Sequence, residues 1–363
     1  MRPSLFILMS LLAFAFPVSK SNAAQTAEVD VFVSGEDDYH TYRIPAIIQT
    51  QKGALIAFAE ARKSSRSDSG DIDLVYKKSL DGGKTWSKMS ILWDDGENTC
   101  GNPCPVIDQK TGRIVLPLTW NHGDDHEGEI KSNKGIDTRR VFLTWSDDEG
   151  ESWVKPREIT PSTKEEDWTW YATGPGNGIQ LKNGKYKGRL VIPCDHNLLV
   201  GDESVRRSHC ILSDDGGKTW RMSEPLERET NECAVVELSD GRLLINMRSY
   251  HGKNLRAIST SEDGGETWSG VTLDPELTEP VCQAALISFG DGQLAFSNPA
   301  STKRDHMTLK LSSDEGKSWP KRLEIYSGSS AYSSLVDLGQ SRLGLLYERD
   351  GYSKIVFLVV DGN

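Results

Sequence analysis

Residues 79–86 read Ser-Leu-Asp-Gly-Gly-Lys-Thr-Trp, and closely similar octapeptides begin at residues 146, 213, 261 and 312. All five follow the pattern Ser-X-Asp-X-Gly-X-Thr/Ser-Trp. The Asp side chain can accept hydrogen bonds from backbone N–H groups two or three residues on, and the Gly can take a positive φ, so each copy predicts a tight hairpin turn. The closing Trp can cover the neighbouring strand and hydrogen-bond through its indole N–H. The repeated coincidence of these residue types argues against five unrelated Asp-Gly turns.

The spacing of the copies indicates what kind of repeat they mark. Successive copies begin 67, 67, 48 and 51 residues apart, which is longer and less even than most helical solenoid repeats. One four-stranded sheet with variable loops fits each interval, and short apolar runs such as residues 46–48, 55–58 and 72–75 alternate with turn residues, as in strands. We therefore predict an all-β fold, a six-bladed β-propeller of four-stranded antiparallel blades, closed where the N- and C-terminal strands meet.

The octapeptides resemble the Asp-boxes (BNR repeats) of sialidases, whose catalytic domains are six-bladed propellers. Asp-boxes also occur in other secreted propellers. The repeat is therefore an argument about fold, and the chemistry has to be argued from other residues.

The first 24 residues have the pattern of a secretory signal peptide. Arg2 precedes an apolar run over residues 5–18, and Ser21-Asn22-Ala23 is a small-X-small cleavage pattern. The run is shorter than the roughly 18 to 20 apolar residues that span a bilayer. We expect a secreted or periplasmic protein with no membrane span, a single propeller catalytic domain over residues 25–363, and a monomer.

Charge and cysteine content exclude some classes of function. The chain has 42 basic and 53 acidic residues and a net charge of -11, which disfavours nucleic acid as a partner. Its six cysteines do not form a compact disulfide framework, and no second Cys or His pair completes a metal site beside the closest two. We expect buried thiols, of which one pair could form a disulfide. We expect neither a metal nor another cofactor. The cysteines are Cys100, Cys104, Cys194, Cys210, Cys233 and Cys282.

Three arginines match the family's carboxylate-binding triad. Arg43 lies in a Tyr-Arg-Ile-Pro segment ahead of the first octapeptide, and the resemblance implies that it supplies the first arginine. Arg248 ends the apolar run that begins at residue 243, and Arg304 precedes the last octapeptide. Lys303 is an alternative for the third position, but a planar guanidinium fork suits a carboxylate better than an ammonium group does.

The strand that ends at Arg62 is followed by a polar loop over residues 63–70. The resemblance implies that Arg62 binds substrate and that Asp68 in the loop is the general acid. A mobile loop suits an acid that must reach a leaving-group oxygen. Asp71 and Asp73 are alternatives: Asp73 falls within a strand pattern, which favours a structural role, and Asp71 remains open.

Three further residues complete the catalytic set that the resemblance implies. Glu232, in an Asn-Glu-X motif, matches the base glutamate, while Glu237, farther into the same strand, is expected to be a blade residue. Tyr332, in an Ala-Tyr-Ser pattern, matches the nucleophilic tyrosine. Glu348, in a Leu-Tyr-Glu pattern, matches a glutamate that orients an arginine.

Two segments are expected to contact the sugar less directly. Asn102, in Gly-Asn-Pro-Cys-Pro, resembles a residue near the sugar's acyl group, with a plain turn as the alternative. Tyr171, just before a Gly-Pro-Gly stretch, is expected to touch the substrate. The charged, His-containing residues 122–127 could be mistaken for a metal site, but they lack rigid ligand spacing, so we expect a loop over the active-site face.

Together these matches imply a retaining exo-α-sialidase that hydrolyses terminal sialic acids from glycoproteins, glycolipids and oligosaccharides through a tyrosyl-enzyme intermediate. Three guanidinium groups can hold the carboxylate of a sialic acid, and that carboxylate would repel an anionic nucleophile but not a neutral tyrosine. The expected partners are sialylated glycoconjugates. The alternatives are a propeller that binds sialylated glycans without hydrolysis, an enzyme for a related nonulosonic acid, and a trans-sialidase.

Overall fold

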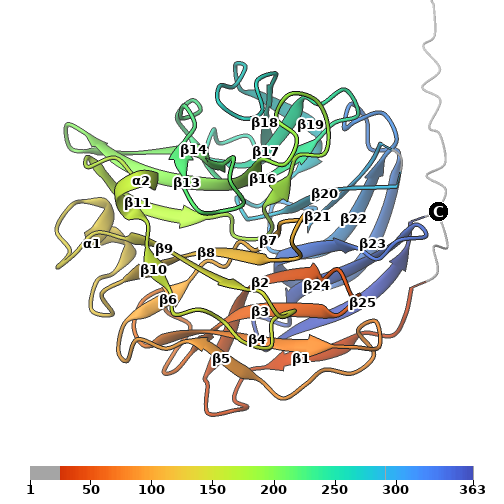
Figure 1. The fold of residues 1–363 in the computed structure, drawn as a ribbon, viewed down its shortest axis with the longest axis horizontal. Helices are drawn as coiled ribbons and strands as arrows, with labels where there is room; N and C mark the ends of the chain where they lie inside the picture. Colours follow the sequence, from red (N-terminus) through yellow and green to blue (C-terminus); the bar gives the residue numbers. More distant parts are fainter. Residues whose placement is uncertain (1–24, 291, 363) are drawn as a thin grey trace, which may run out of the picture.

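The computed structural model describes residues 25–290 and 292–362, so the expected signal peptide of residues 1–24 lies outside the described residues. Within those residues the regular secondary structure is almost entirely β-strand (Figure 1). Two short helices, α1 (Glu127–Lys131) and α2 (Thr160–Thr163), lie in loops between strands. The predicted all-β class is confirmed.

The described strands form four hydrogen-bonded sheets, and the strands of each sheet follow in their spatial order. The first contains β10 (Arg157–Glu158), β9 (Arg140–Ser146), β8 (Ile114–Asn121), β6 (Thr99–Gly101), β4 (Ile72–Ser79), β3 (Leu55–Arg62) and β2 (Thr41–Gln49), with β5 (Ser90–Trp93) on β4 and β7 (Val106–Ile107) on β8. The second contains β11 (Trp168–Thr173), β13 (Leu190–Val200), β14 (Glu203–Ser213) and β15 (Arg221–Met222), with β12 (Ile179–Gln180) on β13. The third contains β16 (Thr230–Glu237), β17 (Leu243–Ser249), β18 (Leu255–Ser261) and β19 (Thr272–Thr278). The fourth contains β1 (Val29–Val33), β25 (Lys354–Asp361), β24 (Arg342–Arg349), β23 (Lys321–Asp337), β22 (Asp305–Ser312), β21 (Gln293–Pro299) and β20 (Ala285–Phe289).

These sheets follow one another around the molecule in chain order, from orange through green to blue in Figure 1, as the blades of a β-propeller do. The ring closes where β1 pairs antiparallel with β25, with Val29 opposite Phe357, which confirms the expected meeting of the terminal strands. β23 is 17 residues long and pairs with β22 through its first part and with β24 through its second, so it links neighbouring units without a break. The count of six blades stays a prediction.

The five octapeptides form the predicted turns. In the first, Ser79 Oγ accepts a hydrogen bond from Gly83 N at 2.8 Å, and Asp81 Oδ1 accepts one from Thr85 N at 2.9 Å. The Asp therefore reaches the N–H four residues on, one residue beyond the range we expected. The same Asp-to-N–H bond recurs in the other copies, at Asp148, Asp215, Asp263 and Asp314.

The closing tryptophans pack as predicted but seldom hydrogen-bond. Trp86 meets the Phe357 ring edge-on, with centroids 5.5 Å apart. Trp220 donates its indole N–H to Gly217 O at 3.1 Å, and Trp319 donates to Asp274 Oδ2 at 3.3 Å. In the other three copies the indole nitrogen is buried without a hydrogen-bond partner, so these rings contribute through packing. These three are Trp86, Trp153 and Trp268.

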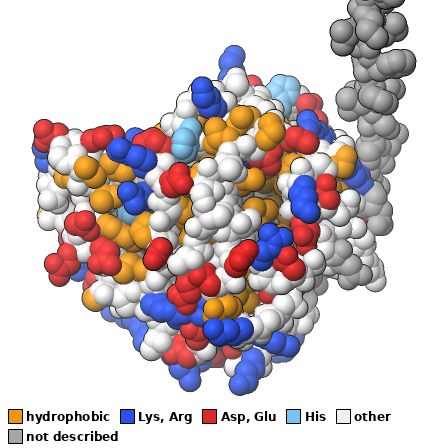
Figure 2. Space-filling model, turned by 90° about the horizontal axis from the view of Figure 1, so that it is seen from above, with side chains coloured by type: hydrophobic (Ala, Val, Ile, Leu, Met, Phe, Trp, Pro, Cys, Tyr) orange, Lys and Arg blue, Asp and Glu red, His pale blue; other side chains and the backbone are white. Residues whose placement is uncertain are grey.

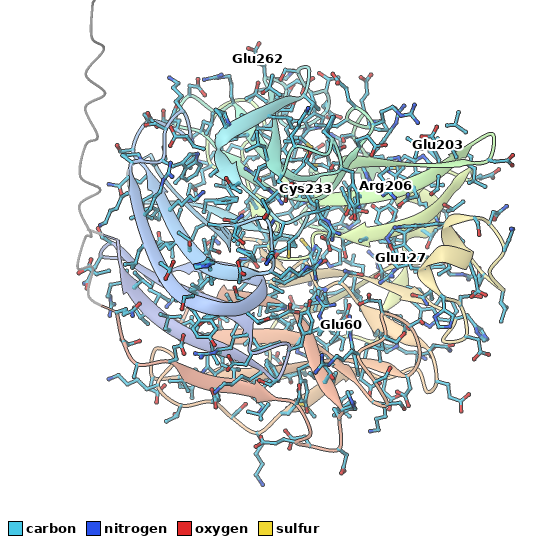
Figure 3. All side chains as sticks on the ribbon, turned by 180° about the vertical axis from the view of Figure 1, so that it is seen from behind. Glu60, Glu127, Glu203, Arg206, Cys233 and Glu262 are labelled. Atoms are coloured by element: carbon cyan, nitrogen blue, oxygen red, sulfur yellow. The ribbon has the colours of Figure 1, made fainter. Side chains whose placement is uncertain are left out.

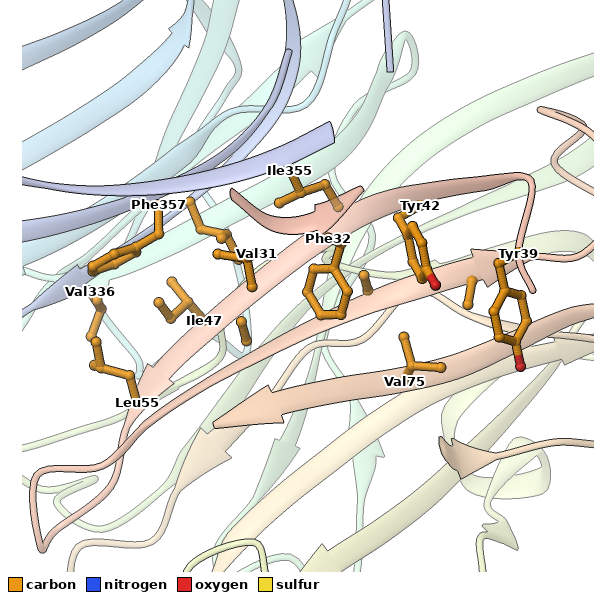
Figure 4. Packing of buried hydrophobic residues seen from close by; sticks show 14 residues of the cluster. Val31, Phe32, Tyr39, Tyr42, Ile47, Leu55, Val75, Val336, Ile355 and Phe357 are labelled. Carbon is orange, nitrogen blue, oxygen red and sulfur yellow. The ribbon is translucent and has the colours of Figure 1, made fainter. Parts of the chain in front are cut away.

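The hydrophobic core lies between neighbouring sheets. Figure 4 shows one such cluster, in which Phe32 from β1, Tyr42 and Ile47 from β2, and Ile355 and Phe357 from β25 pack together. Because each sheet buries one face against the sheet before it and the other against the sheet after it, a ring can grow without a single deep core. All six cysteines are free and buried.

The described residues carry mixed surface charge, with acidic and basic side chains interspersed over the face in Figure 2. Between residues 25 and 362, leaving out residue 291, no helix is long and apolar enough to cross a membrane. In the same part of the chain, no group of three or more His, Cys, Asp or Glu side chains is arranged to hold a metal ion.

Candidate active site

Eight of the ten predicted site residues line one cavity of about 190 Å³. They come from several different strands and from the loops after β3 and β6 and before β22, so only the closed ring brings them together. Inner strands β2, β11, β16 and β23 each have a break in regular pairing beside the cavity. Such bulges turn side chains out of the regular alternation of a strand. The eight residues are Arg43, Arg62, Asp68, Asn102, Glu232, Arg248, Arg304 and Tyr332.

A larger cavity of about 370 Å³ lies at the opposite ends of some of the same strands. It is lined by Ile47 of β2, Glu237 of β16 and Val336 of β23, and it contains none of the predicted site residues. Glu237 accepts hydrogen bonds there from Lys182 N and Asn183 N, which agrees with the structural role expected for it. Most of the predicted catalytic and substrate-binding residues therefore gather at the smaller cavity.

Tyr332 and Glu232 are in direct contact in that cavity. The Tyr332 hydroxyl donates a hydrogen bond to Glu232 Oε1 at 2.5 Å, and both residues are less than a tenth exposed. Arg248 Nη1 lies 2.8 Å from Glu232 Oε2 and 3.2 Å from the Tyr332 oxygen. Burial raises the pKa of Tyr332 well above its ordinary value, the Glu232 carboxylate raises it further, and the charge of Arg248 offsets only part of this. The phenol is therefore neutral at rest, with an acceptor for its proton already in contact.

Glu348 lies directly behind this pair and is fully buried. It accepts hydrogen bonds from Arg43 Nε at 3.1 Å, Arg43 Nη2 at 3.3 Å, Ile44 N at 2.8 Å and Tyr332 N at 3.1 Å. Ile44 has a φ of 59°, a conformation that is strained for a β-branched residue. Glu348 thus fixes the guanidinium of Arg43 and the backbone of Tyr332 at the same time, although it does not line the cavity.

Asp68 lies at the mouth of the cavity with a side chain that is 55% exposed. Its Oδ1 is 2.7 Å from Arg62 Nη2 and 3.3 Å from Arg43 Nη1. Burial opposes ionisation of this carboxyl, but the charges of Arg62 and Arg43 outweigh burial and lower its pKa below the ordinary value. The alternatives to Asp68 lie outside the cavity; among them, Asp73 accepts a hydrogen bond from the Tyr39 hydroxyl.

Arg304 reaches the cavity from the loop before β22. Its Nη1 donates to the Tyr352 hydroxyl at 2.9 Å, and its guanidinium carbon lies 5.6 Å from the centre of the Tyr332 ring. The guanidinium of Arg43 lies 5.1 Å from the same ring centre. Three cations thus surround one neutral tyrosine, which is the arrangement needed to hold an anion beside it.

The opposite wall of the cavity is built around Asn102. Its backbone N donates to Glu60 Oε1 at 3.0 Å, and its side-chain oxygen accepts from Arg139 Nη2. Arg139 is buried under Trp170, with its guanidinium carbon 4.0 Å from that ring. Glu60 also accepts from Arg62 Nη2 at 2.7 Å, so this wall and the loop acid share one hydrogen-bond network.

Tyr171 is not brought to the cavity. It is fully buried, and its hydroxyl lies 3.0 Å from His209 Nε2 within a cluster of aromatic rings. Trp170 and Ala172 line the cavity instead, because successive side chains of a strand point to opposite faces. The expected substrate contact at Tyr171 is therefore wrong: the side chains that line the cavity are those of its two neighbours, Trp170 and Ala172.

Several cavity residues were missed by the sequence reasoning. Glu60 had a usable signal, since it lies two residues before Arg62 on the same strand face. The charged loop expected over the active-site face leads into α1, whose first residue, Glu127, lines the cavity. Figure 3 shows Glu60 and Glu127 on different elements. His126 Nδ1 lies 2.9 Å from Ser69 Oγ, which links this loop to the loop of Asp68. The other missed residues are Ile44, Arg139, Trp170, Ala172, Asp195, Asn231 and Tyr250.

Comparison with known proteins points to one family. Residues 53–345 match the BNR repeat-like domain. The chain is 33% identical over 356 residues to a sialidase of Bacteroides fragilis, covering 91% of this chain and 64% of that protein, so it spans less than two thirds of that relative. It is 32% identical to an exo-alpha-sialidase of Aspergillus fumigatus, covering 93% of this chain and 85% of that protein.

A solved structure agrees in fold. Hadza microbial sialidase Hz136 superimposes with a TM-score of 0.82 and 33% identity, covering 90% of this chain and 67% of that one. The repeat, the propeller and the sequence identity lead to one conclusion: this chain belongs to the sialidase family.

Proposed function

We propose that the protein is a retaining exo-α-sialidase that removes terminal sialic acids from sialylated glycoconjugates. The observation that carries this proposal is the 2.5 Å hydrogen bond from the Tyr332 hydroxyl to Glu232 in a cavity that also presents Arg43, Arg248 and Arg304. Membership of the sialidase family supports the same substrate class.

The three arginines would hold the substrate carboxylate. Charge-assisted bonds to guanidinium groups are strong and directional, and the fixed orientation of Arg43 on Glu348 reduces the cost of ordering it. The bound carboxylate would lie next to the reacting carbon. A neutral tyrosine can approach that carbon without charge repulsion, which a carboxylate nucleophile could not.

In the first step the Tyr332 oxygen would attack the anomeric carbon while Glu232 takes the phenolic proton and Asp68 gives a proton to the departing glycosidic oxygen. The lowered pKa of Asp68 leaves it ionised in the free protein. Binding of an anionic substrate at Arg43 would weaken the hold of Arg43 on Asp68 and so favour the protonated acid. In the second step a water molecule would attack the anomeric carbon and give a proton to Asp68. The bond from that carbon to the Tyr332 oxygen would break, and Glu232 would return the proton to Tyr332.

The test compares wild type with Tyr332→Phe, using release of a fluorogenic aryl sialoside. The variant loses one oxygen and is expected to lose nearly all turnover while remaining folded. A 3-fluorinated sialyl fluoride should leave adduct mass on the Tyr332 peptide of wild type and none on the variant. Tyr171→Phe is the matched control, because that tyrosine is also buried but lies outside the cavity.

Retained turnover in Tyr332→Phe, or adduct on another peptide, would contradict the proposed mechanism. Binding of sialosides by wild type without release of the aryl group would favour a non-hydrolytic glycan-binding propeller. We further propose that the protein is exported and acts as a monomer, on the strength of the signal-peptide pattern in residues 1–24 and of a compact catalytic constellation supplied by a single chain.

A further inference from the structure

Asp195, on β13, is one of the residues that line the active-site cavity, and it has no role in the mechanism above. It is fully buried. Its Oδ2 accepts a hydrogen bond from Asn231 Nδ2 at 2.6 Å, whereas its Oδ1 has no hydrogen-bond partner. A buried polar atom without a partner is costly, and in a native structure it calls for an explanation.

Burial disfavours the ionised form of Asp195, and the charges around it do not reverse this effect. Burial raises the pKa of Asp195 well above its ordinary value, and the nearby Glu232 carboxylate raises it further. Lys131 of α1 and Arg248 of β17 act in the opposite direction but do not outweigh burial. Charged and titratable groups face Asp195 from its own strand and from the neighbouring elements: Glu127, Lys131, Arg139, Tyr171, Cys194, Glu232, Cys233 and Arg248.

We infer that Asp195 stands in the cavity as a neutral carboxylic acid and that its Oδ1–H donates a hydrogen bond to an uncharged oxygen of the bound sugar. Oδ2 already accepts from Asn231, so the proton belongs on Oδ1, the oxygen without a partner. A neutral acid is a donor that adds no negative charge beside Glu232. Bound sugar would supply the missing acceptor, so Asp195 would help to determine which sugars fit. The identity of the ligand rests on the proposed sialidase function.

The first test is spectroscopic and needs no turnover. The infrared difference between wild type and Asp195→Asn at neutral pH should contain the C=O stretch of a protonated carboxyl, and free sialic acid should shift that band to lower frequency. Asp108→Asn is the matched control: Asp108 is also buried, but hydrogen bonds from Thr111 and Gln180 outweigh burial and lower its pKa. The control difference should contain only carboxylate bands.

The second test is kinetic. Asp195→Ala should lower kcat/KM for a full sialoside by roughly 10- to 100-fold, as expected for one buried hydrogen bond left unmade. Asp195→Asn, whose amide can donate from the same position, should recover most of that loss. Hydroxyl and acyl-carbonyl oxygens are distinguished with two substrates, one with a shortened hydroxylated side chain and one without the acylamino group. The penalty of Asp195→Ala should vanish with the substrate that lacks the oxygen contacted by Asp195.

Carboxylate bands in the Asp195 difference spectrum would overturn the neutral acid. Unchanged kinetics in Asp195→Ala, an Asp195→Asn variant as impaired as Asp195→Ala, or a penalty that persists with both modified substrates would overturn the donated hydrogen bond. If Asp195→Ala does not fold, the infrared spectra still test the protonation of Asp195, and the kinetics of Asp195→Asn still test the hydrogen bond to the sugar. A protonated band that does not respond to sialic acid, in a protein that releases no aryl group, would count against the sialidase proposal while leaving the protonation of Asp195 established.

Discussion

Replacing Glu348 by Gln tests the buried ion pair that organises the catalytic side of the cavity. Each carboxylate oxygen accepts two hydrogen bonds: Oε1 from Arg43 Nε and Ile44 N, and Oε2 from Arg43 Nη2 and Tyr332 N. Gln has only one oxygen, so whichever way its amide is turned, an NH2 group faces two donors. One backbone N–H then loses its acceptor, and Arg43 loses its buried counter-charge.

Breaking a buried ion pair in this way costs about 3–5 kcal/mol, which is a large part of a typical domain stability of roughly 5–15 kcal/mol. The matched control is Glu158→Gln, because Glu158 pairs with Arg140 at 3.5 Å while their side chains are 37% and 39% exposed. Such a surface pair contributes about 0–1 kcal/mol. Unfolding in urea measures both free energies.

Activity supplies the second readout for Glu348→Gln. Under conditions where the variant is folded, kcat/KM should fall because Arg43 and Tyr332 both lose their common anchor. Glu158→Gln should keep wild-type activity. A Glu348→Gln variant with full activity and a free energy of unfolding within about 1 kcal/mol of wild type, the range expected for a surface pair, would contradict the role given to this ion pair.

Two further predictions concern stability. The pKa of His209 is lowered to about 3 by burial, and burial also lowers that of His196, whose Nδ1 lies 3.0 Å from His209 Nδ1. Below pH about 6.5 these histidines therefore bind more protons in the unfolded chain than in the folded one, so the free energy of unfolding should fall as the pH drops from 6.5 toward 3, by up to about 1.4 kcal/mol per pH unit for each histidine. Urea titrations of His209→Gln should show a shallower pH dependence than those of wild type. An identical pH dependence would contradict this prediction. In the first octapeptide, Gly83→Ala should lower the thermal midpoint more than Gly82→Ala. Both glycines have a positive φ, but only a Cβ at Gly83 would meet the Phe357 ring, at 2.0 Å. Equal losses in the two variants would argue against that contact.

Most of the active site could be predicted from sequence because its residues lie in short motifs in or beside recognisable strands. Arg43, Glu232 and Tyr332 were each identified in this way, and they line one cavity. Arg139 and Asp195 were missed, because each is held in place by a hydrogen bond to a buried partner from a distant segment: Asn102 for Arg139, and Asn231 for Asp195. No local pattern marks such a pair.

The sequence by itself determined the turn chemistry, because each turn depends on residues within one octapeptide, and it determined the repeating strand units, because the octapeptides recur along the chain. Only the tertiary structure decided which side chains meet. The Tyr332 hydroxyl contacts a glutamate 100 residues away, and Arg43 is held by one 305 residues away. Ring closure supplies these contacts, and bulges in the inner strands set which side chains enter the cavity. Side chains alternate along a strand, so a one-residue irregularity moves a neighbour from core to cavity, as at Tyr171 and Trp170.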